Sequence, residues 1–342
     1  MAEQLDLFGQ PSAPAGLAPA APDPELVRLG AALPANVYLG TSSWSFPGWR
    51  GLVYRDEHSE QVLARKGLAA YARHPLFRSV GIDRTHYATI SKDAFAAYAR
   101  DVPAGFRFLT KAHEACSLAV FPSHARYGAE RGQKNPRFLD PAYARDLVVE
   151  PWASGLGATA GPLVFQFAAQ SMPHLGGTPR RFAEQLFRFL RELPRGHLYA
   201  IEIRNASLMT KDYAAALRAA DAIIRDGRGG VVHCVNLMPG MPAPIAQWRA
   251  VVGDGDPPAA LVIRWNLAPQ RDYESARAAF APFDRLVEPD PRGRADVAAL
   301  IAAATARHVP AWVIVNNKAE GSSPLSVAEL ARELVDGNAP PF

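Results

Sequence analysis

Charged side chains recur where short apolar runs of the sequence end, a position from which distant parts of a chain can share one ligand. Glu202 and Arg204 close the run 198–203, and their spacing of two residues puts both side chains on one face of a strand. Arg264 and Lys111 close two further runs. An arginine can hold a phosphate or carboxylate through two parallel hydrogen bonds, and a lysine adds a point charge. This set of residues therefore indicates binding of a small anion.

Two carboxylates at the ends of apolar runs are the candidate catalytic groups. They are Glu202 and Asp83, which follows the run 77–82. Either can act as a general acid or base if burial raises the pKa of its carboxyl group. Each charged residue taken alone is better explained by a structural ion pair, whereas the group taken together favours a polar ligand site. The predicted ligand-binding residues are Thr41, Ser43, Trp44, Tyr87, Lys111, Gln166, Arg204, Arg264, Asn316 and Asn317. No motif has metal-ligand spacing, so no metal ligand is predicted and the cofactor is unknown.

Small hydroxyl residues and then tryptophans follow the first apolar run, in the segment VYLGTSSWSFPGWRG (37–51). Gly40 lets the backbone approach closely, and the hydroxyls of Thr41 and Ser43 can hydrogen-bond with little bulk. Trp44 and Trp49 supply a rigid apolar wall. Two interpretations fit this stretch equally, a ligand pocket after a strand and a tryptophan-rich turn of the core.

The elements that must position these residues are strands that alternate with helices. Apolar runs typical of buried strands occupy Val37–Leu39, Phe77–Ile82, Phe106–Thr110, Leu163–Phe167, Leu198–Ile203, Gly230–Val235, Leu261–Trp265 and Trp312–Val315. Helical patterns lie between them at Ser59–Arg73, Lys92–Arg100, Pro141–Gly155, Pro179–Leu193, Thr210–Ala220, Ile245–Val251, Asp296–Arg307 and Ser326–Leu334. Ser91, Thr178 and Thr210 stand where N-caps are expected.

Eight strands that alternate with helices predict an α/β fold of the TIM (β/α)₈ type, in which the carboxyl ends of the strands converge on one mouth. A doubly wound open sheet is the alternative, but the chain lacks the glycine fingerprint that would support it. The stretch Asp290–Arg294 is interpreted as an ordinary turn between two elements. The loop Ala112–Asp140 is long, basic and aromatic, and is interpreted as a lid or binding loop or as a surface insertion.

The composition is that of a globular protein without a membrane anchor. Of 342 residues, 49% are hydrophobic and 20% are charged. Cys116 and Cys234 are far apart in the sequence, which fits a reduced, cytoplasmic setting. No apolar stretch approaches the roughly 20 residues of a membrane span, and no secretory signal is recognisable. The net charge of +4 permits contact with anions or nucleic acid without requiring either.

Residues 1–34 are rich in alanine and proline and are predicted to form a flexible tail, with a short helix near Glu25–Leu33, ahead of a barrel domain at 35–342. Within the tail, the pentapeptide Gln4, Leu5, Asp6, Leu7 and Phe8 is a compact apolar cluster. It resembles the peptide by which bacterial replication and repair proteins dock on the DNA polymerase sliding clamp, and all five positions match. Leu7 and Phe8 would fill an apolar groove. A chance match, or packing of the cluster on its own domain, is the alternative.

Seven segments together resemble the widespread bacterial family named domain of unknown function 72 (YecE-like). They are GTSSWSFPGWRGLVY, SVGIDRTHY, GFRFLTK, GPLVFQF, AIEIRNAS, VIRW and VIVNN, in the order and spacing of that family. The resemblance runs from about Val37 to Leu334. It implies a TIM barrel with a polar mouth and no established biochemical activity. The pocket lining that it implies is Gly40, Thr41, Ser43, Trp44, Trp49, Thr85, Tyr87, Lys111, Gln166, Glu202, Arg204, Ser207, Arg264, Asn316 and Asn317.

Departures from the family pattern mark a divergent member. The family's glutamate in its second motif is Gly81 here, its asparagine is Asp83 and its phenylalanine is His86. If that glutamate carried catalysis, this chain uses Asp83 or Glu202 instead or has lost the activity.

Three functions stay open at this point. The first is a hydrolase or lyase acting on a phosphorylated, sugar-like or nucleic-acid-derived ligand. The second is an accessory protein of DNA replication or repair that is tethered to the sliding clamp. The third is a degenerate barrel that binds a ligand without catalysis.

Overall fold

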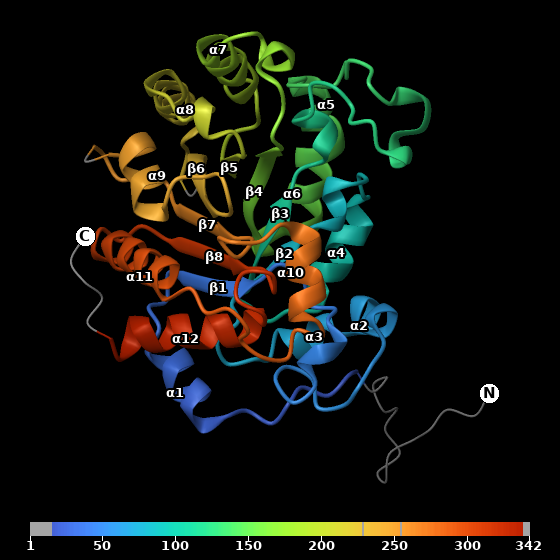
Figure 1. Cartoon of the computed structure of the whole chain (residues 1–342), viewed down its shortest axis with the longest axis vertical. Helices are drawn as coiled ribbons and strands as arrows, with labels where there is room; N and C mark the ends of the chain where they lie inside the picture. Colours follow the sequence, from blue (N-terminus) through green and yellow to red (C-terminus); the bar gives the residue numbers. More distant parts are fainter. Residues whose placement is uncertain (1–15, 228, 254, 338–342) are drawn as a thin grey trace.

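A closed barrel of eight parallel strands forms the centre of the protein (Figure 1). The computed structural model describes residues 16–227, 229–253 and 255–337. The strands are β1 Val37–Thr41, β2 Ser79–Ile82, β3 Arg107–Lys111, β4 Ala160–Phe167, β5 Leu198–Ile203, β6 Gly230–Leu237, β7 Leu261–Trp265 and β8 Ala311–Val315. They follow one another around the barrel in sequence order, and β1 pairs with β8 to close it. Each predicted apolar run forms one strand, which confirms the predicted TIM barrel.

Helices surround the barrel and cover the outer faces of the strands (Figure 1). They are α1 Pro24–Ala32, α2 Glu60–Lys66, α3 Leu68–Tyr71, α4 Lys92–Arg100, α5 Pro141–Ala144, α6 Glu150–Leu156, α7 Pro179–Leu190, α8 Lys211–Ile224, α9 Pro244–Val251, α10 Tyr273–Phe280, α11 Pro291–Ala306 and α12 Ser323–Val335. The predicted caps are confirmed: the side chains of Ser91, Thr178 and Thr210 each accept a backbone N–H in the first turn of α4, α7 and α8.

Two predicted helices are each divided in the structure. Ser59–Arg73 breaks at Gly67 into α2 and α3, where a Cβ would lie 2.6 Å from the carbonyl oxygen of Leu63. Pro141–Gly155 contains a π-helical turn at Arg145–Val149 between α5 and α6. Pro151 has no N–H for the regular i→i−4 bond, which explains the irregular turn that precedes it.

The helix α10 is not predicted from the sequence, and α11 begins earlier than its predicted start at Asp296. The interpretation of Asp290–Arg294 as a turn is wrong, because Asp290 accepts from the Gly293 N–H at 2.9 Å and caps α11. Pro291 fits the first helical position, where its missing N–H costs nothing. The helix α10 begins with a reciprocal pair of bonds between Asp272 and Ser275.

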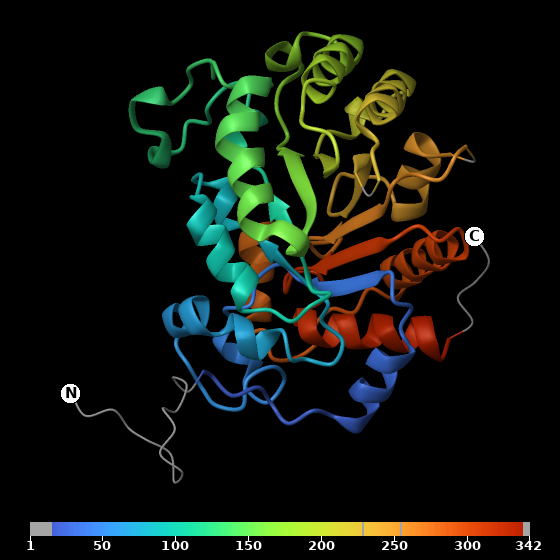
Figure 2. The ribbon, with the colours of Figure 1, turned by 180° about the vertical axis from the view of Figure 1, so that it is seen from behind.

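The helix α1 lies beside α12 in both Figure 1 and the reverse view of Figure 2. Arg28 pairs with Asp336 at 2.6 Å, and Arg332 pairs with Glu25 at 2.7 Å. Leu29 is buried in the same interface. The short helix predicted within the tail is therefore present and packs on the barrel domain, while the domain boundary at residue 35 stays a prediction.

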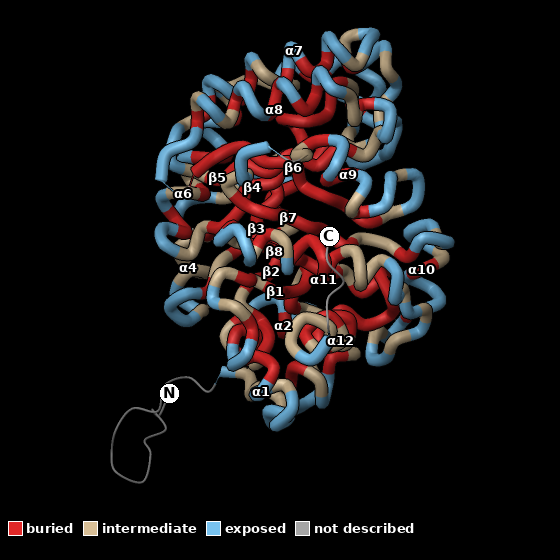
Figure 3. The backbone as a smooth tube through the Cα atoms, turned by 90° about the vertical axis from the view of Figure 1, so that its left-hand side faces the viewer, coloured by how far each residue is buried: buried red, intermediate tan, exposed pale blue. Residues whose placement is uncertain are grey.

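Two apolar cores sit on either side of the barrel wall. The larger one fills the space between strands and helices, and Figure 3 shows the strands buried at the centre with exposed residues on the outer turns of the helices. The smaller one, here called the inner cluster, consists of Leu109, Val164, Leu198, Ala200, Val232, Cys234, Ala260, Val262, Trp312 and Ile314. On each of β5, β6 and β8 two of its members lie two positions apart, so they share the face that points into the barrel.

Candidate functional site

A layer of polar side chains lies directly above the inner cluster, at the carboxyl ends of four strands. Each follows an inner-cluster residue by two positions and so points into the barrel. The four are Lys111 on β3, Gln166 on β4, Glu202 on β5 and Arg264 on β7. All four are buried. The strands thus bring together residues that are up to 153 positions apart in the sequence, since Lys111 and Arg264 share this layer.

Glu202 is the centre of the layer. Its side chain is completely buried, its Oε1 accepts from Arg204 Nε at 2.8 Å, and its Oε2 accepts from Arg264 Nη1. Gln166 Oε1 accepts from Arg204 Nη2 at 3.0 Å and from Arg264 Nη1 at 2.9 Å. The carboxylate and the amide therefore hold both guanidinium groups in place, and Arg204 Nη1 takes part in none of these bonds.

The ionisation of Glu202 follows from these contacts. Burial alone would raise the pKa of the carboxyl group, but Arg264 and Arg204 oppose it and lower the pKa to about 2. The group is a carboxylate at neutral pH with both oxygens accepting from arginines. This geometry suits an anchor for the arginines better than a group that exchanges protons with a ligand.

Lys111 and Asp83 form a second pair beside the first. Lys111 Nζ lies 2.9 Å from Asp83 Oδ2, and Arg264 Nη2 lies 3.9 Å from the same oxygen. Burial, then the charge of Arg264, lowers the pKa of Lys111 to about 8. Burial opposes ionisation of Asp83, but Lys111 and Arg264 together hold the pKa of its carboxyl group below its usual value. Lys111 is thus the member of the site that changes charge nearest neutral pH.

These residues, here called the charged layer (Asp83, Lys111, Gln166, Glu202, Arg204 and Arg264), carry unequal charge. Three cations face two carboxylates, which leaves one positive charge without a counter-charge. The nearby His86 is neutral, because burial lowers the pKa of its imidazole to about 3. Arg204 and Asp83 form the solvent-facing edge, with 24% and 33% of their side chains exposed. An anion would approach the layer at this edge.

Other predicted ligand-binding residues are engaged in holding the fold. Thr41 Oγ1 lies 2.8 Å from the Tyr71 hydroxyl and donates to the Ser43 carbonyl at 2.7 Å. Asn317 Oδ1 accepts from the backbone N–H and the hydroxyl of Ser323, each at 2.8 Å, and so fixes the start of α12.

The remaining predicted residues after β1 and β8 also contact neighbouring side chains of the fold. Trp44 is buried and meets Tyr98 edge-on at 5.4 Å. Ser43 Oγ lies 3.1 Å from Ser45 Oγ, and Asn316 Nδ2 donates to Ser42 Oγ at 3.0 Å. For the stretch after β1, the geometry favours the interpretation as a tryptophan-rich core turn.

The long loop Ala112–Asp140 extends from the mouth, and its basic residue Arg126 reaches back to it. Arg126 Nη2 lies 2.6 Å from Glu114 Oε2, and its guanidinium carbon is 4.9 Å from the centre of the Tyr87 ring. Glu114 was missed from the sequence, because nothing local distinguishes it from a surface acid. Tyr87 is 59% exposed beside this pair.

Gly81, which stands where the resemblance places a glutamate, has a packing reason to be glycine. A Cβ at this position would lie 2.8 Å from the Ser42 carbonyl oxygen and 3.1 Å from Ser42 Cα. The loop after β1 therefore occupies the space that a larger side chain at Gly81 would need.

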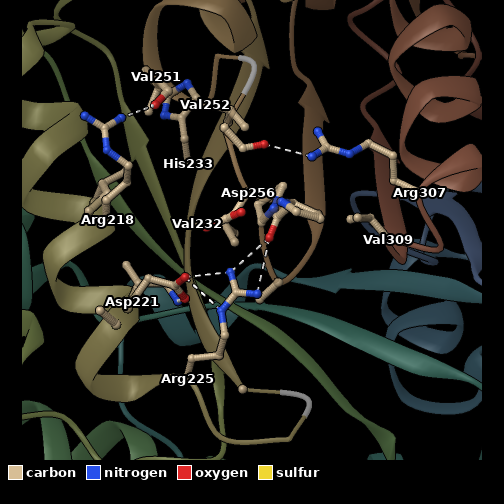
Figure 4. Close-up of a pocket in the computed structure, with 18 of the residues that line it drawn as sticks. Arg218, Asp221, Arg225, Val232, His233, Val251, Val252, Asp256, Arg307 and Val309 are labelled. Atoms are coloured by element: carbon tan, nitrogen blue, oxygen red, sulfur yellow. Dashed lines mark hydrogen bonds and ion pairs between the residues drawn. The ribbon is translucent and has the colours of Figure 1, made fainter.

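A cavity of about 720 Å³ lies at the opposite end of the barrel, near the amino-terminal ends of β6 and β8 (Figure 4). Its arginines are bound to backbone carbonyls of the surrounding loops. Arg218 donates to Val251, Arg225 to Pro257 and Arg307 to Gly255, at 2.8–3.2 Å. Because residues at this end of a TIM barrel usually serve stability, we assign these arginines to holding the loops.

Within the described ranges, no group of three or more His, Cys, Asp or Glu side chains is arranged to hold a metal ion. No helix in the same ranges is both long and apolar enough to span a membrane. The pentapeptide Gln4–Phe8 lies outside the described residues, so the sliding-clamp tether stays a prediction.

The closed barrel and the charged residues at the carboxyl ends of its strands define a TIM-barrel protein with a polar mouth. The chain belongs to the family described as protein of unknown function DUF72, whose sequence model matches residues 38–341. This confirms the resemblance drawn from the strand-end motifs.

Solved structures of DUF72 family proteins share the fold. One from Enterococcus faecalis V583 is 15% identical with a TM-score of 0.55, and the match covers 88% of this chain and 95% of that one. One from Thermotoga maritima MSB8 is 19% identical with a TM-score of 0.50, covering 87% and 98%. No curated protein matches the chain. At these identities the likeness establishes the fold alone.

Proposed function

We propose that the mouth of the barrel binds a small molecule through its phosphate or carboxylate group. The observation that carries this proposal is the unbalanced positive charge of the charged layer, where Lys111, Arg204 and Arg264 face only Glu202 and Asp83. A buried charge without a counter-charge costs free energy, and a bound anion removes that cost.

Two unused donors support the same proposal. Arg264 is buried, and its Nε has no hydrogen-bond partner among the described residues. Arg204 is partly exposed with Nη1 outside the bonds to Glu202 and Gln166. Hydrogen bonds from guanidinium groups to anions are about twice as strong as neutral ones, so these donors favour an anionic partner.

The chemistry that the site supports is proton transfer in a hydrolase or lyase reaction. Lys111 has a pKa of about 8, so its ammonium group can give up a proton to a ligand or to solvent, and take one back, near neutral pH. Asp83, 2.9 Å away, stays a carboxylate because its pKa is lowered, and it stabilises the charged form of Lys111. Of the two carboxylates predicted to be catalytic, Asp83 is the one that reaches solvent, and Glu202 orients the arginines. We therefore assign proton transfer to Lys111, with Asp83 as its ionised partner.

A barrel that binds the anion without turnover is a second candidate, and Gly81 in place of the family's glutamate favours it. The two candidates differ in one measurement. Incubation with a ligand that binds the mouth gives product in the first case and unchanged ligand in the second.

The anion site is tested by isothermal titration with inorganic phosphate and ribose 5-phosphate. Loss of a charged hydrogen-bond donor costs about 1.5–3 kcal/mol, so Arg204→Ala should weaken binding roughly tenfold to hundredfold. Arg180→Ala is the matched control, because Arg180 lies on α7 and pairs at 3.2 Å with the exposed Glu184. Wild-type affinity in the Arg204→Ala variant would overturn the assignment.

A further inference from the structure

Two exposed aromatic rings stand at the carboxyl end of the barrel beside the charged layer. Tyr87 and Tyr273 are 59% and 58% exposed, more than any other exposed large hydrophobic side chain in the described ranges. Tyr87 follows β2 and the short 3₁₀ turn Arg84–His86, and Tyr273 begins α10 after β7. An exposed aromatic ring next to a polar site is suited to contact with the apolar part of a ligand.

A cation lies over each ring. The guanidinium carbon of Arg126 is 4.9 Å from the centre of the Tyr87 ring, and Lys318 Nζ is 4.1 Å from the centre of the Tyr273 ring. Such contacts hold a ring in position and leave its other face available. Neither tyrosine hydroxyl has a hydrogen-bond partner within the described part of the chain, so neither hydroxyl is used to hold the fold.

The segment that carries Tyr273 is firmly attached near the mouth. Phe283 meets Phe46 of the loop after β1 edge-on at 5.5 Å, and a Cβ at Gly48 would lie 1.8 Å from the Pro282 carbonyl oxygen. Figure 1 draws α10 in front of β2, and Figure 3 shows it at the edge of the molecule, beyond the strands. The ring of Tyr273 is thus presented from a packed element.

Both rings lie within the electrostatic reach of Asp83. Burial, then the charge of Asp83, raises the pKa of the Tyr87 hydroxyl, and Tyr273 adds to the same effect. Asp83 also acts on Lys318, which lies over Tyr273. Asp83 is itself paired with Lys111, so both tyrosines stand beside the charged layer.

We propose that Tyr87 and Tyr273 stack on the heteroaromatic ring of a ligand whose phosphate lies on the charged layer, so that the mouth takes a nucleoside monophosphate. The proposal rests on the proposed function, since the charged layer supplies the phosphate site. A nucleobase suits this arrangement because its flat faces stack on tyrosine rings.

The experiment compares adenosine monophosphate with ribose 5-phosphate, which differ by the base, in isothermal titrations of the full chain. Stacking of one base on one aromatic side chain is worth roughly a five- to hundredfold gain in affinity, so adenosine monophosphate should bind at least about fivefold more tightly. Tyr87→Ala and Tyr273→Ala should each remove most of that gain and leave the affinity for ribose 5-phosphate unchanged. Tyr87→Phe keeps the ring and should keep the gain.

The outcomes separate this inference from the anion site. Equal affinity for adenosine monophosphate and ribose 5-phosphate overturns the inference. So does tighter binding of adenosine monophosphate that both alanine variants retain. Both results count against the inference whether or not the affinity for ribose 5-phosphate falls in Arg204→Ala. If neither probe binds, or if Arg204→Ala binds ribose 5-phosphate as the wild type does, the anion site itself fails. Circular dichroism of each variant establishes that a loss of affinity does not reflect unfolding.

Discussion

Arg264 on β7 donates a hydrogen bond to Glu202 on β5, across the strand β6 that separates them. The two residues are 62 positions apart in the sequence and meet inside the barrel. Their contact turns separate strand-end charges into one network, because Gln166 and Arg204 bond to the same pair. The predictions below follow from this network and its neighbours.

Glu202→Gln should strongly destabilise the protein. The substitution keeps the shape of the side chain but leaves the buried guanidinium of Arg264 without its counter-charge, which costs about 3–5 kcal/mol. Urea denaturation measures the free energy of unfolding. Glu184→Gln, which breaks an exposed pair with Arg180, is the control and should cost less than about 1 kcal/mol. Sulfate should stabilise Glu202→Gln more than it stabilises the wild type. Similar losses of unfolding free energy in Glu202→Gln and Glu184→Gln would contradict the prediction.

Anion affinity should fall as the pH rises through about 8. Lys111 binds an anion when protonated, and its pKa of about 8 means that the cation is lost above that pH. Sulfate is the probe because its charge does not change between pH 7 and 9.5. The dissociation constant measured by titration calorimetry should increase by up to about tenfold per pH unit above 8, since one proton is linked to binding. Lys111→Met should bind weakly at every pH in this range. A wild-type affinity that is independent of pH would exclude Lys111 from the anion site.

Gly81→Ala should destabilise the barrel. The added Cβ would lie 2.8 Å from the Ser42 carbonyl oxygen, and overpacking of this kind costs about 1–3 kcal/mol. Gly16→Ala is the control, because a Cβ there meets nothing within 4 Å. Thermal unfolding compares the two variants. A melting temperature of Gly81→Ala equal to that of the wild type would show that the loop after β1 yields readily, and a glutamate at this position would then be worth testing.

The pentapeptide Gln4–Phe8 should bind the sliding clamp if its resemblance is functional. Burial of Leu7 and Phe8 would contribute roughly 1.5–3 kcal/mol each, so Leu7→Ala/Phe8→Ala should weaken capture on immobilised clamp at least tenfold. Leu147→Ala removes an exposed apolar side chain elsewhere and should change nothing. Equal capture of the double variant and the wild type would rule out the tether.

The local pattern of the sequence was sufficient to predict the eight-stranded barrel. Each strand is a short apolar run, and each run was recognisable by itself because a buried parallel strand is apolar on both faces. The helix α10 was missed, although Asp272 and Ser275 form a capping pair that its sequence carries. Its eight residues have mixed polarity, and its buried residues Ala276 and Phe280 pack with Ala268 in a small separate cluster that no local pattern describes.

The sequence by itself determined that polar residues end most of the strands, because the type and order of residues along a strand are local properties. Only the tertiary structure decided which of them meet. Closure of the barrel brings Glu202 to Arg264 and Lys111 to Asp83, whereas Thr41 and Asn317 bond to Tyr71 and Ser323 to hold the fold. The physical reason is that the barrel's register and its close packing set side-chain partners over long distances in the chain, and strand patterns carry no record of that register.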